Sequence, residues 1–142
     1  MTTAYERLRN MPNMTLLQML IFGEARGEPI DGMVAVAWVA RNRVENPSWW
    51  GDTWKNVILK PKQFSCFNEN DPNFSRLFDM YAVRFSDPMA RLCRWIAGGV
   101  IYNWIPNNIG EANHYCHVDI LPGWAEGQEP VKIIGHHKFY CL

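Results

Sequence analysis

The sequence predicts an α+β fold that is predominantly α, with a small β-element at the C-terminus. Two observations lead to this fold class. Apolar residues recur at helical spacing up to about Val100, and beyond it short apolar runs alternate with proline, glycine and asparagine. The chain has 142 residues, 48% hydrophobic and 20% charged, a balance that can bury one core. We therefore expect a single domain over residues 1–142.

The first expected helix runs from about Thr15 to Arg26. Thr15 and Gln18 resemble a capping box, and the apolar residues that follow have helical spacing. Gly27 is a suitable end because glycine adopts the left-handed conformation that closes many helices, and Pro29 prevents continuation. Glu24 would then lie in the last turn.

The second expected helix begins at a cap formed by Asp31 and runs to about Val44. Its residues are apolar nearly all round, which predicts a helix in the centre of the fold. Thr53 is expected to start a short helix that ends at Leu59, after which Pro61 opens a loop.

Asp-Pro pairs at residues 71–72 and 87–88 predict the starts of two further helices. The first carries apolar residues at helical spacing as far as Phe85, and the second is expected to stop at the glycine pair 98–99. The last run, VKIIGHHKFY at residues 131–140, predicts an extended, hairpin-like end.

Charge and aromatic content restrict the function. Fourteen basic and fourteen acidic residues leave no net charge, so no overall field favours nucleic acid, and we expect no nucleic-acid partner. Seven Trp, seven Phe and five Tyr are many for this length. Aromatic faces fill cores, but they also line grooves that stack on the apolar faces of sugar rings.

The four cysteines stand far apart and form no CxxC pair. We expect buried or loop thiols and no disulfide. A cysteine nucleophile at Cys66 or Cys116, paired with a histidine, is an alternative, but neither thiol stands at an evident electropositive helix start.

Glu24 is the strongest candidate for a catalytic residue. The preceding segment LLQMLIF is apolar, so the carboxyl is expected to be partly desolvated, which raises its pKa toward the range of a general acid. The alternative is a structural glutamate that is exposed or paired with Arg26 or Arg41. Glu28 lies four residues on, but the helix is expected to end between the two, so we predict a structural role for Glu28.

Several segments in this order resemble the SleB/CwlJ-type cell wall hydrolase family, over roughly residues 14 to 140. They are GEARGEP with the following DGMVAVAWVARNRV, PKQFSC, ANHYCH, PGWA and IGHHKFY. The resemblance implies a lysozyme-like, lytic-transglycosylase-like domain that degrades peptidoglycan and has its catalytic glutamate at Glu24. It leaves open whether the enzyme is a muramidase-type glycosidase or a lytic transglycosylase, which requires no second carboxylate. No cofactor is expected.

The loop at residues 63–65 combines an amide, an aromatic ring and a hydroxyl, and the alternative is a loop that only packs Phe64. Residues 113–115 offer a similar set, and the resemblance favours a place beside the cleft for them and matches His137 to a histidine of the family. Their amide, hydroxyl, imidazole and aromatic groups suit the N-acetyl and hydroxyl groups of a sugar. The candidate substrate-binding residues are Gln63, Phe64, Ser65, Asn113, His114, Tyr115 and His137.

Two alternatives from other classes stay open. The four histidines could indicate a zinc amidase or peptidase, but no HExxH motif is present and the spacing defines no ligand set, so we predict no metal site. Calcium dependence is associated with some relatives, yet no acidic loop of EF-hand type is present. A non-catalytic peptidoglycan-binding module would keep the groove without turnover.

The N-terminus lacks the apolar core of a signal peptide, and the apolar run 16–22 is too short to span a bilayer. We therefore expect a monomer made in the cytoplasm, with no stable membrane insertion, that acts on the wall after release. A phage endolysin that depends on a holin, or a bacterial protein with another release factor, would fit this pattern.

Overall fold

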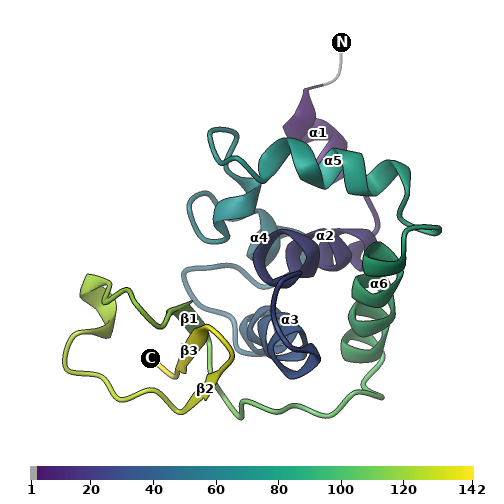
Figure 1. The fold of residues 1–142 in the computed structure, drawn as a ribbon. Coiled ribbons are helices and arrows are strands. Elements are labelled where there is room, and N and C mark those ends of the chain that lie inside the picture. Colours follow the sequence, from purple (N-terminus) through teal and green to yellow (C-terminus); the bar gives the residue numbers. More distant parts are fainter. Residues whose placement is uncertain (1–2) are drawn as a thin grey trace.

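The computed structural model describes residues 3–142 and confirms the predicted fold class. Within that range six α-helices form a helical body, and a small antiparallel sheet follows near the C-terminus (Figure 1). The elements are α1 (Ala4–Arg9), α2 (Asn13–Ala25), α3 (Ile30–Glu45), α4 (Trp54–Leu59), the 3-10 turn η1 (Ser65–Phe67), α5 (Phe74–Ala82), α6 (Pro88–Ile101), β1 (His114–His117), the 3-10 turn η2 (Gly123–Ala125), β2 (Lys132–Ile134) and β3 (His137–Tyr140).

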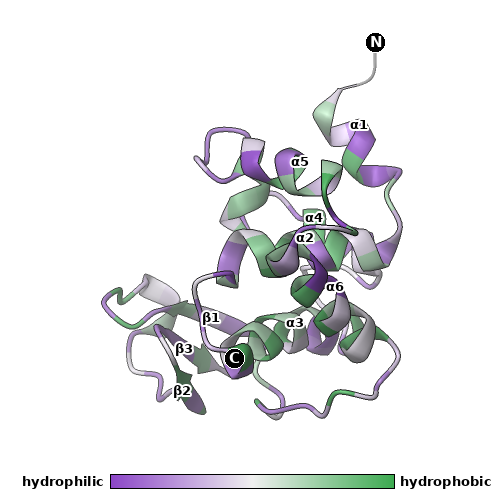
Figure 2. Cartoon of the chain, turned by 45° about the vertical axis from the view of Figure 1, so that its right-hand side comes forward, coloured by the Kyte–Doolittle hydropathy of each residue, from purple (hydrophilic) through white to green (hydrophobic). Residues whose placement is uncertain are grey.

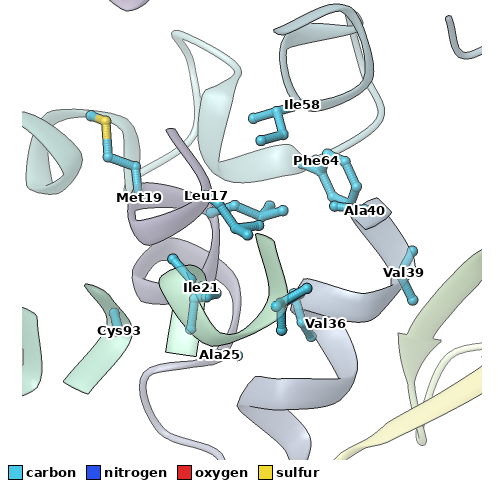
Figure 3. Packing of buried hydrophobic residues seen from close by; sticks show 14 of the residues in the cluster. Leu17, Met19, Ile21, Ala25, Val36, Val39, Ala40, Ile58, Phe64 and Cys93 are labelled. Carbon is cyan, nitrogen blue, oxygen red and sulfur yellow. The ribbon is translucent and has the colours of Figure 1, made fainter. Parts of the chain in front are cut away.

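Helix α2 lies at the centre of the helical body. It packs against α3, α4, α5 and α6, and most of its residues are buried. Figure 3 shows Leu17 and Ile21 of α2 beside Val36 of α3, and Figure 2 shows hydrophobic stretches on both helices. Each fully buried side chain of this size contributes roughly 1.5–3 kcal/mol relative to an exposed one. The core therefore holds the end of α2, and with it Glu24, in a rigid position.

The predicted boundaries of α2 are correct to within two residues, but their predicted causes are wrong. The helix begins at Asn13, so Thr15 and Gln18 lie inside it and are buried rather than forming a capping box. The Gln18 amide instead donates to the carbonyls of Arg84 and Ala90, at 3.0 and 2.9 Å. Tertiary hydrogen bonds satisfy this polar group, a partner that local sequence could not reveal.

The junction between α2 and α3 also differs from its prediction. Helix α2 ends with Arg26 in a right-handed conformation, and Gly27 is not left-handed, so the glycine is not its cap. Helix α3 begins at Ile30, directly after Pro29, which leaves Asp31 in the first turn instead of at the cap. A negative side chain there still interacts favourably with the helix dipole.

The starts of α4 and α6 follow the predicted caps, whereas α5 does not. Thr53 accepts from the Asn56 amide at 3.1 Å, and Asp87 accepts from the Ala90 amide at 2.9 Å. Helix α5 begins only at Phe74, because Asp71 accepts from the Asn73 amide in a preceding turn. Its end at Ala82 leaves Phe85 exposed and outside the helix.

Helix α6 does not stop at Gly98 and Gly99, as predicted, but continues to Ile101. The glycines serve packing instead of termination. The side chain of Ile105 folds back over the helix, and a Cβ atom at Gly99 would lie 2.2 Å from the Ile105 Cδ1 atom. The absence of a side chain at Gly99 therefore lets the following segment close over α6.

Gly99→Ala is expected to destabilise the protein, because neither the helix backbone nor the buried Ile105 can move freely. Overpacking of this kind costs about 1–3 kcal/mol, which corresponds to a fall in Tm of roughly 3–10 °C. Thermal unfolding followed by circular dichroism measures the change. Gly123→Ala is the control, since a Cβ atom there meets nothing within 4 Å. Equal Tm values for the two variants would contradict this account.

The C-terminal hairpin is confirmed, and a third strand joins it. Strands β2 and β3 are antiparallel, with Ile134 opposite His137 across a two-residue turn. Strand β1 pairs with the other edge of β3, which gives the order β1-β3-β2. Phe139 in β3 is fully buried in the core, so the sheet is fastened to the helical body beside α3.

The short helix α1 was not predicted, although its signal is present in the sequence. Thr3 accepts from the Glu6 amide, and the Glu6 carboxylate accepts from the Thr3 amide, so the two form a capping box. Along residues 3–142, no helix is both long and apolar enough to cross a bilayer.

Candidate active site

Glu24 lies in the last turn of α2 at the edge of a cleft of about 310 Å³. Helix α2 supplies one side, the segment before and at the start of η1 supplies another, and β1 and β3 supply the third. The cleft is lined by Glu24, Arg43, Gln63, Phe64, Ser65, His114, Tyr115, Cys116, His117, Ile120, Trp124 and His137.

Two hydroxyl groups hold the Glu24 carboxyl. The Tyr115 hydroxyl donates to Oε1 at 2.7 Å, and the Ser65 hydroxyl donates to Oε2 at 3.3 Å. Tyr115 comes from β1 and Ser65 from η1, so segments 91 and 41 residues away in sequence converge on one side chain. This arrangement fixes the direction in which each carboxyl oxygen points.

Burial raises the pKa of Glu24 above its ordinary value. The hydrogen bonds from Tyr115, Ser65 and the Cys66 backbone act in the opposite direction, because they favour the ionised form, and the negative charge of Asp71 adds slightly to the rise. A carboxyl with a raised pKa keeps its proton closer to neutral pH, which a general acid requires.

The close contact between α2 and η1 depends on Gly23. A Cβ atom at this position would lie 2.6 Å from the Cys66 Cβ atom and 2.7 Å from its Sγ atom. Glycine therefore lets η1 approach the helix, and this approach brings Ser65 to the Glu24 carboxyl.

The thiols beside the cleft are poor nucleophiles. Burial raises the pKa of Cys66 well above its usual range, and the neighbouring Glu24 and Asp71 add to the rise. Desolvation also raises the pKa of Cys116. All four cysteines are free thiols. Since the thiolate is the reactive form, these values count against the cysteine-nucleophile alternative.

Six of the seven residues predicted to bind substrate line the same cleft as Glu24; they are Gln63, Phe64, Ser65, His114, Tyr115 and His137. Phe64 is only 2% exposed and stacks on Tyr115 with ring centroids 6.3 Å apart, so it supports the wall more than it presents a face. The six come from one chain segment, residues 63–65, and from strands β1 and β3, which the fold brings together.

Asn113 does not share this position. Its amide donates to the carbonyl of Leu142 at 3.0 Å and its carbonyl accepts from the Leu142 amide, while it lines a separate hollow with Asn42. Its Oδ1 atom also lies 2.8 Å from Nδ1 of His114. Asn113 therefore does not line the cleft in this structure, because its side chain turns toward the C-terminus and contacts His114, and its role in substrate binding stays a prediction.

Five residues of the cleft were not predicted; they are Arg43, Cys116, His117, Ile120 and Trp124. Trp124 was within reach of sequence reasoning, because it belongs to the PGWA segment. It is 38% exposed, and its ring centroid lies 5.0 Å from that of His114. An exposed aromatic face on a cleft wall is suited to stacking on a sugar ring.

Arg43 is a buried cation at the base of the cleft. Its guanidinium lies over the rings of Trp49, Trp50 and Phe64, at 5.7, 5.1 and 5.3 Å from their centroids. Nε donates to the carbonyl of Asn113 at 2.7 Å. Burial lowers the pKa of Arg43 to about 10, so it is charged at neutral pH. Arg43 belongs to the segment DGMVAVAWVARNRV, so a signal was present in the sequence, but its burial was not expected because an arginine in a helix is usually exposed.

Glu28 lies beside the cleft and contacts the turn between β2 and β3. Its carboxylate accepts from the backbone N–H of His136 at 2.7 Å and lies 2.8 Å from the Nδ1 atom of the same residue. Burial alone would raise the pKa of Glu28, but these hydrogen bonds outweigh it and the pKa is lowered. Glu28 thus joins the α2–α3 junction to the β2–β3 turn.

The histidines near the site do not form a recognisable metal centre. Across residues 3–142, no group of three or more His, Cys, Asp or Glu side chains has the arrangement of a metal site. Desolvation, with the charge of Arg43, lowers the pKa of His114 to about 4, so this imidazole is neutral. A neutral imidazole can donate or accept a hydrogen bond at the cleft wall.

Comparison with known proteins identifies related chains. The family profile described as Cell Wall Hydrolase matches residues 27–140, a range that begins three residues after Glu24. A spore cortex-lytic enzyme of Oceanobacillus iheyensis is 30% identical over 132 residues, which cover 89% of this chain and 41% of that protein. The spore cortex-lytic enzyme of Bacillus subtilis is 29% identical, with 92% and 40% covered. The chain spans about two fifths of the length of these relatives.

Two solved structures share the fold. The catalytic domain of the germination-specific lytic transglycosylase SleB from Bacillus anthracis superposes with a TM-score of 0.66 at 26% identity, over 90% of this chain and 93% of that one. The catalytic domain of the Bacillus cereus SleB protein gives a TM-score of 0.64 at 28% identity, over 90% and 88%. The similarity therefore extends over almost the whole of each domain.

Proposed function

This chain belongs to the cell wall hydrolase family, and on that premise we propose that it is a lytic transglycosylase that cleaves the glycan strands of peptidoglycan. Two of its relatives, a spore cortex-lytic enzyme and a germination-specific lytic transglycosylase, support this proposal. The superposed chains are catalytic domains of about the same extent, so we further propose that residues 1–142 act as one catalytic unit.

The observation that carries the proposal is a single carboxyl in the cleft. Of the described residues that line it, only Glu24 bears a carboxyl group. Retaining hydrolysis needs a second carboxylate at roughly 5–5.5 Å, and inverting hydrolysis needs one at roughly 6.5–9.5 Å. Glu28 does not line this cleft. It shares an adjoining space of about 500 Å³ with Glu24, where its carboxylate accepts from the backbone N–H of His136 and lies 2.8 Å from the His136 Nδ1 atom. A transglycosylase needs no such partner, because the sugar supplies its own nucleophile.

In the first step, neutral Glu24 donates its proton to the oxygen of the glycosidic bond. The bond between that oxygen and the anomeric carbon breaks, and positive charge develops on the sugar ring beside the new carboxylate. Tyr115 donates to Oε1, so we assign the transferred proton to Oε2, the oxygen near Ser65. The rise in the Glu24 pKa favours the protonated form that this step consumes.

In the second step, the 6-hydroxyl of the same muramic acid attacks the anomeric carbon. The Glu24 carboxylate accepts the hydroxyl proton, so the enzyme returns to its starting state and a 1,6-anhydro ring forms. No water molecule enters the bond. The hydrogen bond from Tyr115 stabilises the carboxylate between the two steps, when the charge is on the protein.

Substrate contacts are proposed for the polar and aromatic groups that line the cleft. Gln63 and His137 can hydrogen-bond hydroxyl or N-acetyl groups, and the exposed face of Trp124 can stack on a sugar ring beside His114. Phe64 would act from behind this surface by supporting Tyr115.

Digestion of purified sacculi is expected to yield anhydromuropeptides, because the intramolecular attack leaves no reducing end on muramic acid. Mass spectrometry distinguishes these products from hydrolysed ones, which are heavier by one water. Glu24→Gln serves as the inactive control in the same digest.

Other products would contradict the proposal in distinct ways. Reducing ends alone would indicate a muramidase, and free stem peptides on intact glycan would indicate an amidase or peptidase. Binding to sacculi without soluble fragments would indicate a non-catalytic module. The monomeric state and release to the wall through a holin or another factor stay predictions.

A further inference from the structure

Another hollow, of about 270 Å³, lies next to the cleft and plays no part in the chemistry described above. Helix α1, the residues before and within α4, and the segment after α4 surround it. Its lining consists of Tyr5, Arg9, Ser48, Trp49, Trp50, Gly51, Lys55, Asn56, Leu59, Lys60 and Pro61. We refer to it as the basic hollow.

The basic hollow concentrates positive charge in a protein that has no net charge. Arg9, Lys55 and Lys60 line it, and no acidic residue does. Within residues 3–142, none of these three cations takes part in an ion pair. Glu6, on the same helix as Arg9, does not line the hollow and instead accepts from the Thr3 amide. The three charges are therefore available to an anion from outside the chain.

One layer of aromatic rings separates the basic hollow from the catalytic cleft. Trp49 and Trp50 line the hollow, and their ring centroids lie 6.2 and 6.1 Å from that of His114, which lines the cleft. Trp49 is 54% exposed, so its ring is open to a ligand. A sugar chain that passes Trp124 and His114 would next meet Trp49 and the rim of the hollow.

We propose that the basic hollow is a subsite for the stem peptides of peptidoglycan and binds their carboxylates. This inference rests on the proposed function. The sugars that bear a stem are uncharged, because the lactyl carboxyl is amide-bonded to the peptide, whereas each stem carries free carboxylates on a flexible peptide. Lysine and arginine at the mouth of a hollow attract such groups, and Trp49 offers a face to the apolar parts of the peptide.

The charge of the stem, rather than its presence, is the variable to test. Two substrates are made from one batch of sacculi from which teichoic acid has been removed. One keeps its stem carboxylates, and in the other carbodiimide coupling to methylamine converts them to neutral amides. Both keep the same glycan and the same peptide length.

The variant is the double substitution Lys55→Gln and Lys60→Gln, and the control is Arg91→Gln. Arg91 is exposed on α6 and lines none of the hollows described above. For the wild-type protein, KM should be about five- to tenfold lower on the charged sacculi than on the neutral ones. The double variant should lose this difference with kcat unchanged, and Arg91→Gln should keep it.

A direct binding experiment tests this inference independently of the proposed function. A soluble stem tetrapeptide is titrated by NMR into Glu24→Gln protein with and without the double substitution, so no turnover is involved. The Trp49 indole signal should shift only when both lysines are present, and added salt should weaken binding. If sacculi are not cleaved at all but this shift appears, the proposed function fails and the subsite stands.

Three results would overturn the subsite. The first is a double variant that keeps the wild-type preference for charged sacculi, and the second is a double variant that loses activity equally on both substrates. Alternatively, its defect could appear only on sacculi that retain teichoic acid, which would make a phosphate polymer the ligand of the hollow.

Discussion

Replacing Glu24 by glutamine should lower the rate of sacculus cleavage by on the order of 10³-fold. The amide has nearly the same shape. Its carbonyl oxygen can still accept from Tyr115 and its NH2 group can donate to the Ser65 hydroxyl, but it has no acidic proton to give to the glycosidic oxygen. The release of soluble fragments from labelled sacculi, measured at several substrate concentrations, gives kcat and KM separately. We expect the loss in kcat, because the substituted group acts only in the reaction.

A folded but inactive protein is the informative outcome for Glu24→Gln. Since the folded-state pKa of Glu24 is raised, ionising this group costs stability as the pH rises through that pKa. The amide never ionises, so the Tm of the variant at alkaline pH should equal or exceed that of the wild type. Glu129→Gln, at an exposed position, controls for the loss of one charge. Activity near the wild-type level would refute the assignment of Glu24.

Tyr115→Phe should lower kcat by about 10- to 100-fold, because a hydrogen bond to a charged group contributes roughly 1.5–3 kcal/mol. The phenylalanine keeps the ring that packs on Phe64 and His137 and removes only the donor to Glu24. Burial and the neighbouring Glu24 raise the pKa of Tyr115 well above its usual range. The phenol therefore stays a donor through both chemical steps.

The pH profile distinguishes positioning of the carboxyl from a loss of folding. The bond from Tyr115 lowers the pKa of Glu24, so its removal should raise that pKa further. The rate of the acid step falls as the pH rises through the Glu24 pKa, and this alkaline limb should move to higher pH in Tyr115→Phe. Tyr81→Phe on α5 is the control and should leave the limb in place. An unchanged limb with a reduced rate would indicate that Tyr115 has only a structural effect.

Local patterns in the sequence were sufficient for most of the secondary structure. Apolar spacing located α2, α3 and α6, and the caps at Thr53 and Asp87 are those that the structure contains. Such signals are reliable because they depend on neighbours within a few residues along the chain. They fail at Gly99. This glycine does not end α6 but makes room for Ile105, a residue that lies beyond the helix.

For the candidate site too, the sequence predicted some features and only the tertiary contacts established the others. The sequence by itself determined that a glutamate ends an apolar helix, and its motifs indicated which segments would accompany it. Only the tertiary structure decided that Tyr115 and Ser65 meet the two oxygens of Glu24, that Asn113 turns away, and that Arg43 is buried under tryptophans. Contacts between residues far apart in sequence depend on how the packed helices and sheet meet, and a desolvated carboxyl acquires its pKa only from those contacts.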